Sequence, residues 1–234
     1  EINASGGRSI SVPGDVTADE YPKKIMDATI AAFGGLNILV NNAGYTWDAV
    51  IHKTTAKQWD AMFAVHCTAP FRLIQAAAPY MRDAAKKEME ANDEGKPTTQ
   101  RCILNVSSTS GVHGNAGQAN YSTCKMGVVG LTKTIAKEWG AYGIRCNALV
   151  FGTIKTRLVG NKDGRANHVL PNGEKVVLGI PGGMDADTMA TMNNTPLRRA
   201  GTVEEAAGSM LMLASKHSGY ITGHALEVTG GAYL

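Results

Sequence analysis

The feature that most constrains this chain is a tyrosine placed four residues before a lysine, where a helical pattern opens. Tyr121 and Lys125 share one face of that helix, because residues four apart are neighbours on a helix surface. An ammonium beside a phenol stabilises the phenolate, so we expect Lys125 to lower the pKa of Tyr121 from its ordinary value of about 10. A tyrosine tuned in this way can exchange a proton with an alcohol or carbonyl oxygen near neutral pH.

A serine precedes this pair at the end of a predicted strand. Ser108 stands 13 residues before Tyr121 and closes a run that starts with the apolar residues 102–104. Its hydroxyl could bond the same substrate oxygen and hold that oxygen in line with the phenol. Residues 101–146 therefore predict a strand, a loop of small residues and a helix that together carry acid–base chemistry.

Further motifs accompany Tyr121 and Lys125 in a fixed order along the chain. They are Asn41-Asn42-Ala43-Gly44, Gly117-Gln118-Ala119-Asn120-Tyr121, Ile221-Thr222-Gly223 and Gly230-Gly231. A tyrosine four residues before a lysine arises by chance in many helices, but the whole set resembles the short-chain dehydrogenase/reductase family. Within that family the chain is most similar to the 3-oxoacyl-[acyl-carrier-protein] reductase type, through residues 114–118 and 196–201.

The resemblance implies an α/β fold with a doubly wound, Rossmann-like parallel sheet, in one domain over residues 1–234. It also implies an oxidoreductase that moves a hydride between NAD or NADP and a carbonyl or secondary alcohol, with a 3-oxoacyl thioester as one candidate substrate. In this interpretation Tyr121 is the general acid and base, and Ser108 positions the substrate oxygen. Lys125 lowers the pKa of the tyrosine and bonds the nicotinamide ribose.

The same resemblance places the cofactor beyond the ends of several strands. Asp15 follows a predicted strand over residues 9–12 and would bond the adenine amino group, with a helix-capping role as the alternative. Small residues after a predicted strand over residues 36–40 would let the cofactor approach the backbone, and Asn41 could brace neighbouring strands. The predicted cofactor-binding residues are Asp15, Val16, Asn42, Ala43, Gly44, Tyr121, Lys125, Gly152, Ile154 and Thr156.

One position departs from the family pattern. The family usually has a catalytic asparagine five residues before a phenylalanine, and counting back from Phe71 gives His66. That asparagine is thought to hold a water that links the lysine to solvent. Histidine can donate and accept hydrogen bonds, so His66 could hold the same water, or it could be a packed helix residue.

The family's glycine-rich phosphate-binding loop has no match in these residues. We therefore expect the chain to be part of a longer polypeptide whose N-terminal piece carries that loop, and to lack the first two strands of the sheet. The predicted strand over residues 36–40 would then be an unpaired edge, although its apolar composition is typical of a strand buried on both faces. A chain that really begins at Glu1 should bind nicotinamide cofactor weakly.

The rest of the pattern is mostly helical. The expected elements are a helix capped by Asp19 and ending near Phe33, a helix over residues 54–90 interrupted near Pro70, a strand over residues 144–150, a helix over residues 203–215 and a strand over residues 225–228. Six apolar residues of the second of these elements would face the core or a partner subunit: Trp59, Met62, Phe63, Phe71, Ile74 and Ala78. Residues 157–200 are typical of a substrate lid, with Met184, Met189 and Met192 as its apolar cover or as ordinary packing.

Composition excludes several classes of function. A net charge of +3 is too mild to indicate binding to nucleic acid or to a membrane surface, and no apolar run approaches membrane-spanning length. Four widely spaced cysteines indicate neither a metal site nor a disulfide framework, so we expect a cytoplasmic protein. Cys124 is either a reactive thiol or, as is commoner, a small apolar helix residue. His113 is either a substrate contact or a surface loop residue.

Two classes of function stay open at this point. Ser108, Tyr121 and Lys125 favour an enzyme that acts on a small-molecule carbonyl or alcohol. The unmatched glycine-rich loop and His66 favour a non-catalytic scaffold or binding module that keeps the family fold. In either case the apolar surface of the predicted helices indicates a homo-oligomer, either a dimer or a tetramer.

Overall fold

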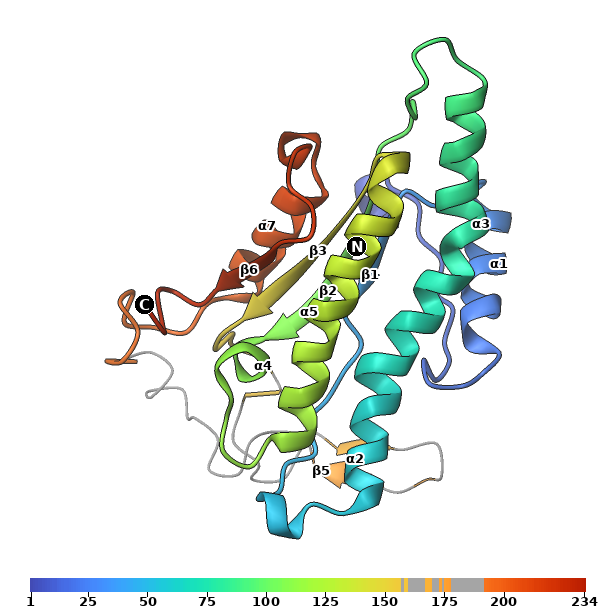
Figure 1. Ribbon diagram of the computed structural model, residues 1–234. Helices are drawn as coiled ribbons and strands as arrows, with labels where there is room; N and C mark the ends of the chain where they lie inside the picture. The colour runs from blue at the N-terminus through green and yellow to red at the C-terminus, as the bar shows by residue number, and fades with distance from the viewer. Residues whose placement is uncertain (157, 160–166, 170–172, 174, 178–191) are drawn as a thin grey trace.

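Four parallel strands form the central sheet, in the order β1-β2-β3-β6 (Figure 1). Their bounds are β1 (Ile38–Asn41), β2 (Arg101–Ser108), β3 (Ile144–Phe151) and β6 (Ala225–Val228). The computed structural model describes residues 1–156, 158–159, 167–169, 173, 175–177 and 192–234. The α/β, Rossmann-like class predicted from the sequence is confirmed, because parallel strands alternate with helices that cover both faces of the sheet.

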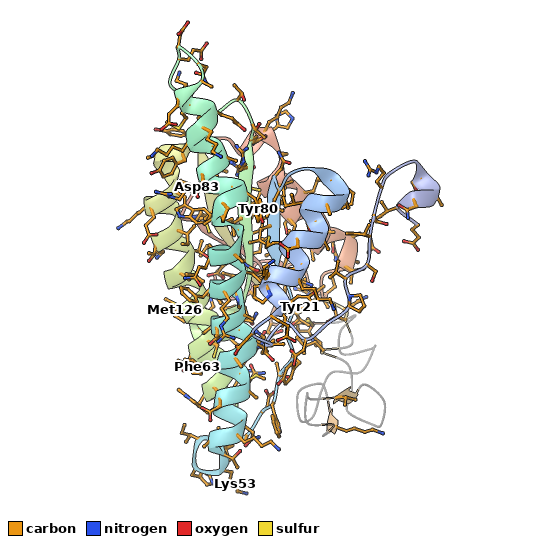
Figure 2. The ribbon with its side chains drawn as sticks, turned by 90° about the vertical axis from the view of Figure 1, so that its right-hand side faces the viewer. Tyr21, Lys53, Phe63, Tyr80, Asp83 and Met126 are labelled. Atoms are coloured by element: carbon orange, nitrogen blue, oxygen red, sulfur yellow. The ribbon has the colours of Figure 1, made fainter. Side chains whose placement is uncertain are left out.

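Helices pack on both faces because successive residues of a strand point to opposite sides. Ile103 of β2 packs into the cluster made with α3 (Ala69–Glu90), α5 (Ala119–Trp139) and α1 (Tyr21–Phe33). Its neighbours Cys102 and Leu104 pack instead against Leu213 of α7 (Val203–Ala214), on the other face. Figure 2 shows the helices of the first face lying side by side. The chain therefore forms three layers, with β2 and β3 at the centre.

Strand β1 lies at the edge of the sheet, as predicted. Its backbone pairs with β2 on one side, and no strand of the described residues pairs with its other side. Ile38 and Val40 are 46% and 42% exposed. The expectation of burial on both faces is therefore wrong for this strand, because apolar composition alone does not supply a covering layer.

The segment before α1 differs most from prediction. Residues 9–12 form no strand, since a strand needs a neighbour with which to pair its backbone, and no strand in the described part of the chain pairs with them. A short 3₁₀-helix, η1 (Asn3–Ser5), precedes this segment. Asp19 does not cap α1, whose N-cap is Glu20; the Asp19 carboxylate instead accepts a 2.6 Å hydrogen bond from Arg72.

The predicted helix over residues 54–90 is present with its interruption. It consists of α2 (Ala56–Phe63), a π-helical turn η3 (Ala64–Thr68) and α3, and Pro70 stands in the first turn of α3. A proline is tolerated there because its fixed φ suits the first turn of a helix. Of its apolar residues, Met62 and Ile74 are buried, whereas Trp59 and Phe71 are 38% and 50% exposed.

The other elements are short. They are η2 (Ile51–Lys53), α4 (Thr109–His113), η4 (Gly140–Tyr142), η5 (Lys216–Ser218) and an antiparallel pair made of β4 (Asn167–Val169) and β5 (Lys175–Val177). Most of the predicted lid over residues 157–200 lies outside the described residues, as do Met184 and Met189; Met192 is buried. None of the helices described here is long and apolar enough to cross a membrane.

Candidate active site

The carboxyl ends of the parallel strands bring the predicted site residues to one edge of the sheet. Residues 42–44 follow β1, Ser108 ends β2, and Gly152 follows β3. In the strand register, β1 ends with Asn41 opposite Asn105, three residues before the end of β2, and β2 and β3 end together with Ser108 opposite Phe151. This is the edge where ligands bind in open α/β sheets.

A side-chain hydrogen bond braces the first two strands, as predicted for Asn41. Its Nδ2 donates to Oδ1 of Asn105 at 2.8 Å, and Nδ2 of Asn105 donates in turn to Oγ1 of Thr132 on α5 at 2.9 Å. All three side chains are buried. The chain of bonds therefore ties β1, β2 and α5 together below the site.

Tyr121 and Lys125 lie on one face in the first two turns of α5, as predicted. They are only 7% and 4% exposed. The Nζ of Lys125 lies 5.5 Å from the centre of the Tyr121 ring and donates a 2.7 Å hydrogen bond to the carbonyl oxygen of Val106 in β2. The ammonium is thus held between the main chain of β2 and the tyrosine ring.

The pKa of Tyr121 differs from the sequence-based expectation. Burial raises it to about 12, the nearby Asp48 carboxylate acts in the same direction, and a hydrogen bond with Ser108 acts against them. Burial also lowers the pKa of Lys125 to about 8. Close packing removes both groups from water, and this disfavours the charged form of each. Tyr121 is therefore protonated at neutral pH.

Ser108 ends β2, as predicted, and the helix α4 follows it where the sequence predicts a loop. Its hydroxyl accepts a 3.2 Å hydrogen bond from the N–H of Ser110 and so caps α4. The same side chain hydrogen-bonds Tyr121. The structure therefore brings together Ser108, Tyr121 and Lys125.

His66 also belongs to this cluster. It lies in the π-helical turn η3, is 2% exposed, and meets the Tyr121 ring edge to face with centroids 5.1 Å apart. Its Nε2 donates to the carbonyl oxygen of Tyr45 at 2.8 Å, since a carbonyl only accepts. Burial, and then the Lys125 ammonium, hold the pKa of His66 well below its usual range. The ring is therefore neutral, and its Nδ1 is a buried acceptor without a partner among the described residues.

A cavity of about 1100 Å³ opens beside β1. It is lined by five of the predicted cofactor-binding residues, namely Asp15, Val16, Asn42, Ala43 and Gly44. Asp15 accepts hydrogen bonds from the N–H and hydroxyl of Thr17 at 2.9 and 2.8 Å, so it caps a turn and not a helix. Tyr45 lines the cavity and also packs with Tyr121 in one cluster. This residue therefore lies between the cavity and the tyrosine–lysine pair.

Glycine is required at position 44. A Cβ built there would lie 2.4 Å from Cε1 of His66, so any side chain would displace the imidazole. The contact keeps residues 42–44 close to η3 and leaves their backbone open to the cavity. This fits a group that approaches the main chain closely, as the adenosine and nicotinamide portions of a dinucleotide do.

The predicted cofactor-binding residues Gly152, Ile154 and Thr156 lie beyond β3. They are not among the described residues that line the cavity. Gly152 donates its N–H to the carbonyl oxygen of Val228 at 3.1 Å, and a Cβ there would lie 3.1 Å from the Cα of Thr229. Ile154 is buried and forms an isolated bridge with Gly201, whereas Thr156 is exposed. These residues border the site from the β3 side.

The structure adds positioning residues to which the sequence assigned no role. Three hydrogen bonds join residues 47–49 to residues 117–120, at the start of α5: Asn120 Nδ2 to Trp47 O at 3.1 Å, Gln118 Nε2 to Asp48 Oδ2 at 2.9 Å, and Ala49 N to Gly117 O at 2.9 Å. Asn120 also accepts from the N–H of Tyr121 at 2.8 Å. Gln118 and Asn120 belong to the motif that ends at Tyr121, and this motif is the sequence feature that could have indicated their role. They fix the tyrosine relative to the segment after β1.

His113 lies in α4 and not in a loop. Its Nε2 is 3.1 Å from both carboxylate oxygens of Glu227, and its ring stacks on Tyr233 with centroids 4.3 Å apart. These contacts tie the segment after Ser108 to the C-terminal residues.

Comparison with known proteins agrees with this arrangement. The family model described as enoyl-(acyl carrier protein) reductase matches residues 1–233. The chain belongs to the short-chain dehydrogenase/reductase family. It is 32% identical to the 3-oxoacyl-[acyl-carrier-protein] reductase FabG of Thermotoga maritima, over 94% of this chain and 75% of the relative. It is also 32% identical to the (3R)-3-hydroxyacyl-CoA dehydrogenase of Canis lupus familiaris, over 99% of this chain and 76% of the relative.

Membership of the short-chain dehydrogenase/reductase family makes the protein an NAD(P)-dependent oxidoreductase. The residues present fit the adenosine and nicotinamide portions of the cofactor, because Asp15 and the small residues 42–44 line the cavity beside β1 and Gly44 keeps its backbone accessible.

Proposed function

We propose that this short-chain dehydrogenase/reductase interconverts a carbonyl and a secondary alcohol, using NADP or NAD, and that 3-oxoacyl thioesters are its substrate class. The observation that carries the proposal is the cluster of Ser108, Tyr121 and Lys125 at the carboxyl end of β2. The names of two relatives, a 3-oxoacyl-[acyl-carrier-protein] reductase and a (3R)-3-hydroxyacyl-CoA dehydrogenase, support the substrate class.

Tyr121 acts as the general acid in the reductive direction. Its pKa of about 12 keeps the phenol protonated at neutral pH, so it has a proton to give to the carbonyl oxygen. The Ser108 hydroxyl, which hydrogen-bonds Tyr121, donates to the same oxygen and fixes its direction. The two donors together stabilise the negative charge that develops on that oxygen.

Lys125 supports this transfer electrostatically. Its ammonium, held against the Val106 carbonyl, stabilises the phenolate that is left when Tyr121 gives up its proton. With a pKa of about 8, Lys125 is mostly protonated at neutral pH and can also return a proton from solvent. His66, neutral and with an open Nδ1, accepts a hydrogen bond in the position where the family has its relay asparagine.

The cofactor would be held along the cavity beside β1. Asp15 would bond the adenine amino group, and the backbone of residues 42–44 would contact the ribose and nicotinamide. Gly152, Ile154 and Thr156 would border the nicotinamide from the β3 side. When bound, the reduced nicotinamide supplies the hydride, and the chain's own residues supply orientation and the proton.

The proposal includes a homo-oligomer. Phe71 on α3 and Met126 on α5 are 50% and 49% exposed, and these helices lie side by side in Figure 2, with Met126 on the side away from α1. Apolar side chains of this size are typical of an interface between copies of one chain.

One experiment tests the function and excludes the scaffold alternative. Oxidation of the reduced nicotinamide is followed with a 3-oxoacyl thioester and with a simple ketone, for the parent, Ser108→Ala and the exposed control Thr123→Ala. We expect turnover of the thioester to fall at least about 100-fold in Ser108→Ala and to be unchanged in the control. Tight nicotinamide binding by fluorescence without turnover of either carbonyl would point to the scaffold; turnover of the ketone alone would overturn only the substrate class.

A further inference from the structure

Two cysteines meet where the π-helical turn packs against the candidate catalytic helix. Cys67 follows His66 in η3, and Cys124 precedes Lys125 in α5. The Sγ of Cys67 donates a hydrogen bond to the carbonyl oxygen of Cys124 at 3.6 Å, and the two thiols are themselves hydrogen-bonded. Both are free cysteines. The two thiols therefore lie side by side where η3 packs against α5.

The two thiols lie in different environments. Cys124 is fully buried, whereas Cys67 is partly exposed. Gly127 faces the Cys67 sulfur, and a Cβ at that position would lie 3.5 Å from it, in ordinary van der Waals contact. Cys67 is therefore the more accessible of the two thiols.

The electrostatic environment also makes Cys67 the more reactive of the two thiols. The hydrogen bond from the Cys124 thiol lowers the pKa of Cys67, and the Lys125 ammonium lowers it further against the effect of partial burial. Donation of that hydrogen bond raises the pKa of Cys124, and burial adds to this effect. An accessible thiol with a lowered pKa beside a second, protonated thiol is the arrangement typical of an attacking and a resolving cysteine.

We propose that Cys67 and Cys124 form a peroxide-sensitive pair that closes into an intrachain disulfide. The Cys67 thiolate attacks hydrogen peroxide, breaking the O–O bond, forming a Cys67 sulfenic acid and releasing hydroxide. The Cys124 thiol then attacks the sulfenic sulfur, the S–S bond forms, and water leaves with the thiol proton. Peroxide gains two electrons and is reduced to the level of water, and the two cysteines together lose two electrons and two protons.

The bridge would join the two segments that carry the candidate active site. Because Cys67 follows His66 and Cys124 precedes Lys125, the disulfide would fix the position of His66 relative to Lys125 and would link η3 covalently to α5. The other two cysteines cannot serve in this way. Cys102 and Cys146 lie in the buried strands β2 and β3, and burial raises the pKa of each.

The test is mass spectrometry of the purified protein after treatment with hydrogen peroxide, with and without later reduction by dithiothreitol. The parent should lose the mass of two hydrogen atoms, and the reductant should restore it. Digestion should place the bond between the peptides that hold Cys67 and Cys124. Cys67 should react at least about tenfold faster than Cys102 and Cys146.

Two variants sharpen the test. Cys67→Ser, at a partly exposed position, should show no loss of mass. Cys124→Ser should leave a Cys67 sulfenic acid that dimedone traps, since the resolving thiol is gone. The proposal is overturned by a bridge between two chains, by oxidation first at Cys102 or Cys146, or by a parent whose cysteines all stay reduced under conditions that oxidise a free thiol.

Discussion

The imidazole of His66 meets the ring of Tyr121 edge to face, with the two centroids 5.1 Å apart. Both rings are buried, and each is kept uncharged at neutral pH by that burial. The contact connects the π-helical turn to the start of α5, so the residue that departs from the family pattern touches the predicted acid directly. Its chemistry is therefore open to a direct test.

Replacing His66 by asparagine should leave turnover unchanged or raise it slightly. An amide, like a neutral imidazole, offers one donor side and one acceptor, so it can replace both the bond to Tyr45 and the open Nδ1. Steady-state kinetics of His66→Asn checks this, with the exposed His52→Asn as a matched control. A tenfold loss of activity in a variant that melts like the parent would give the histidine a role that an amide cannot fill.

Asn120→Asp should lower kcat by about 10- to 100-fold with little change in KM. The carboxylate keeps an acceptor for the Tyr121 N–H but loses the donors to the carbonyl oxygens of Trp47 and Gln58. The start of α5 then shifts, and the phenol with it. Asn37→Asp, on an exposed surface, is the control. If KM rises while kcat is unchanged, Asn120 does not position the acid.

Glu88→Gln should destabilise the fold by about 2 kcal/mol at neutral pH. A hydrogen bond from Arg101 lowers the pKa of Glu88 from 4.5 to about 2. A carboxylate whose folded pKa is depressed stabilises the fold above its unfolded pKa, and the contribution is lost as pH falls from about 4.5 toward 2. Urea unfolding of parent and variant should thus converge in acid. The exposed Glu90→Gln should change little, and an equal loss of stability at every pH would contradict this reading.

Phe71→Asp should shift the protein toward monomers. The substitution places a charge on the exposed apolar face of α3, and burying that charge between copies is costly. Light scattering at micromolar concentration measures the effect, with the 70% exposed Ile51→Asp on η2 as the control. A parent that is already monomeric would contradict the proposed oligomer.

Local pattern was enough to predict most elements of this chain. The strand over residues 225–228 and the start of the helix at residue 203 were predicted at the residues observed, because apolar runs and capping residues bound them. Residues 9–12 have the composition of a strand, but pairing depends on a neighbour that local sequence does not specify. Composition therefore indicates that a segment can form a strand, but the segment forms one only where a neighbouring strand is present to pair with it.

The candidate site shows the same division. The spacing of Tyr121 and Lys125 predicts their shared face, but the pKa of Tyr121 rises where a fall was expected, because burial is a property of the whole packed site. The roles of Gln118 and Asn120 could not be read from the sequence either. They depend on residues 47–49, about 70 positions earlier in the chain, lying against the start of α5.

The central claim is that Tyr121 donates the proton in a nicotinamide-dependent reduction, and Tyr121→Phe tests it most directly. The measurement is turnover of a 3-oxoacyl thioester, paired with nicotinamide affinity by fluorescence, in parent and variant. Removal of one hydroxyl should reduce turnover at least about 100-fold and leave affinity nearly unchanged, since only the transferable proton is lost. Activity within tenfold of the parent, in a folded variant that still binds the cofactor, would contradict the account.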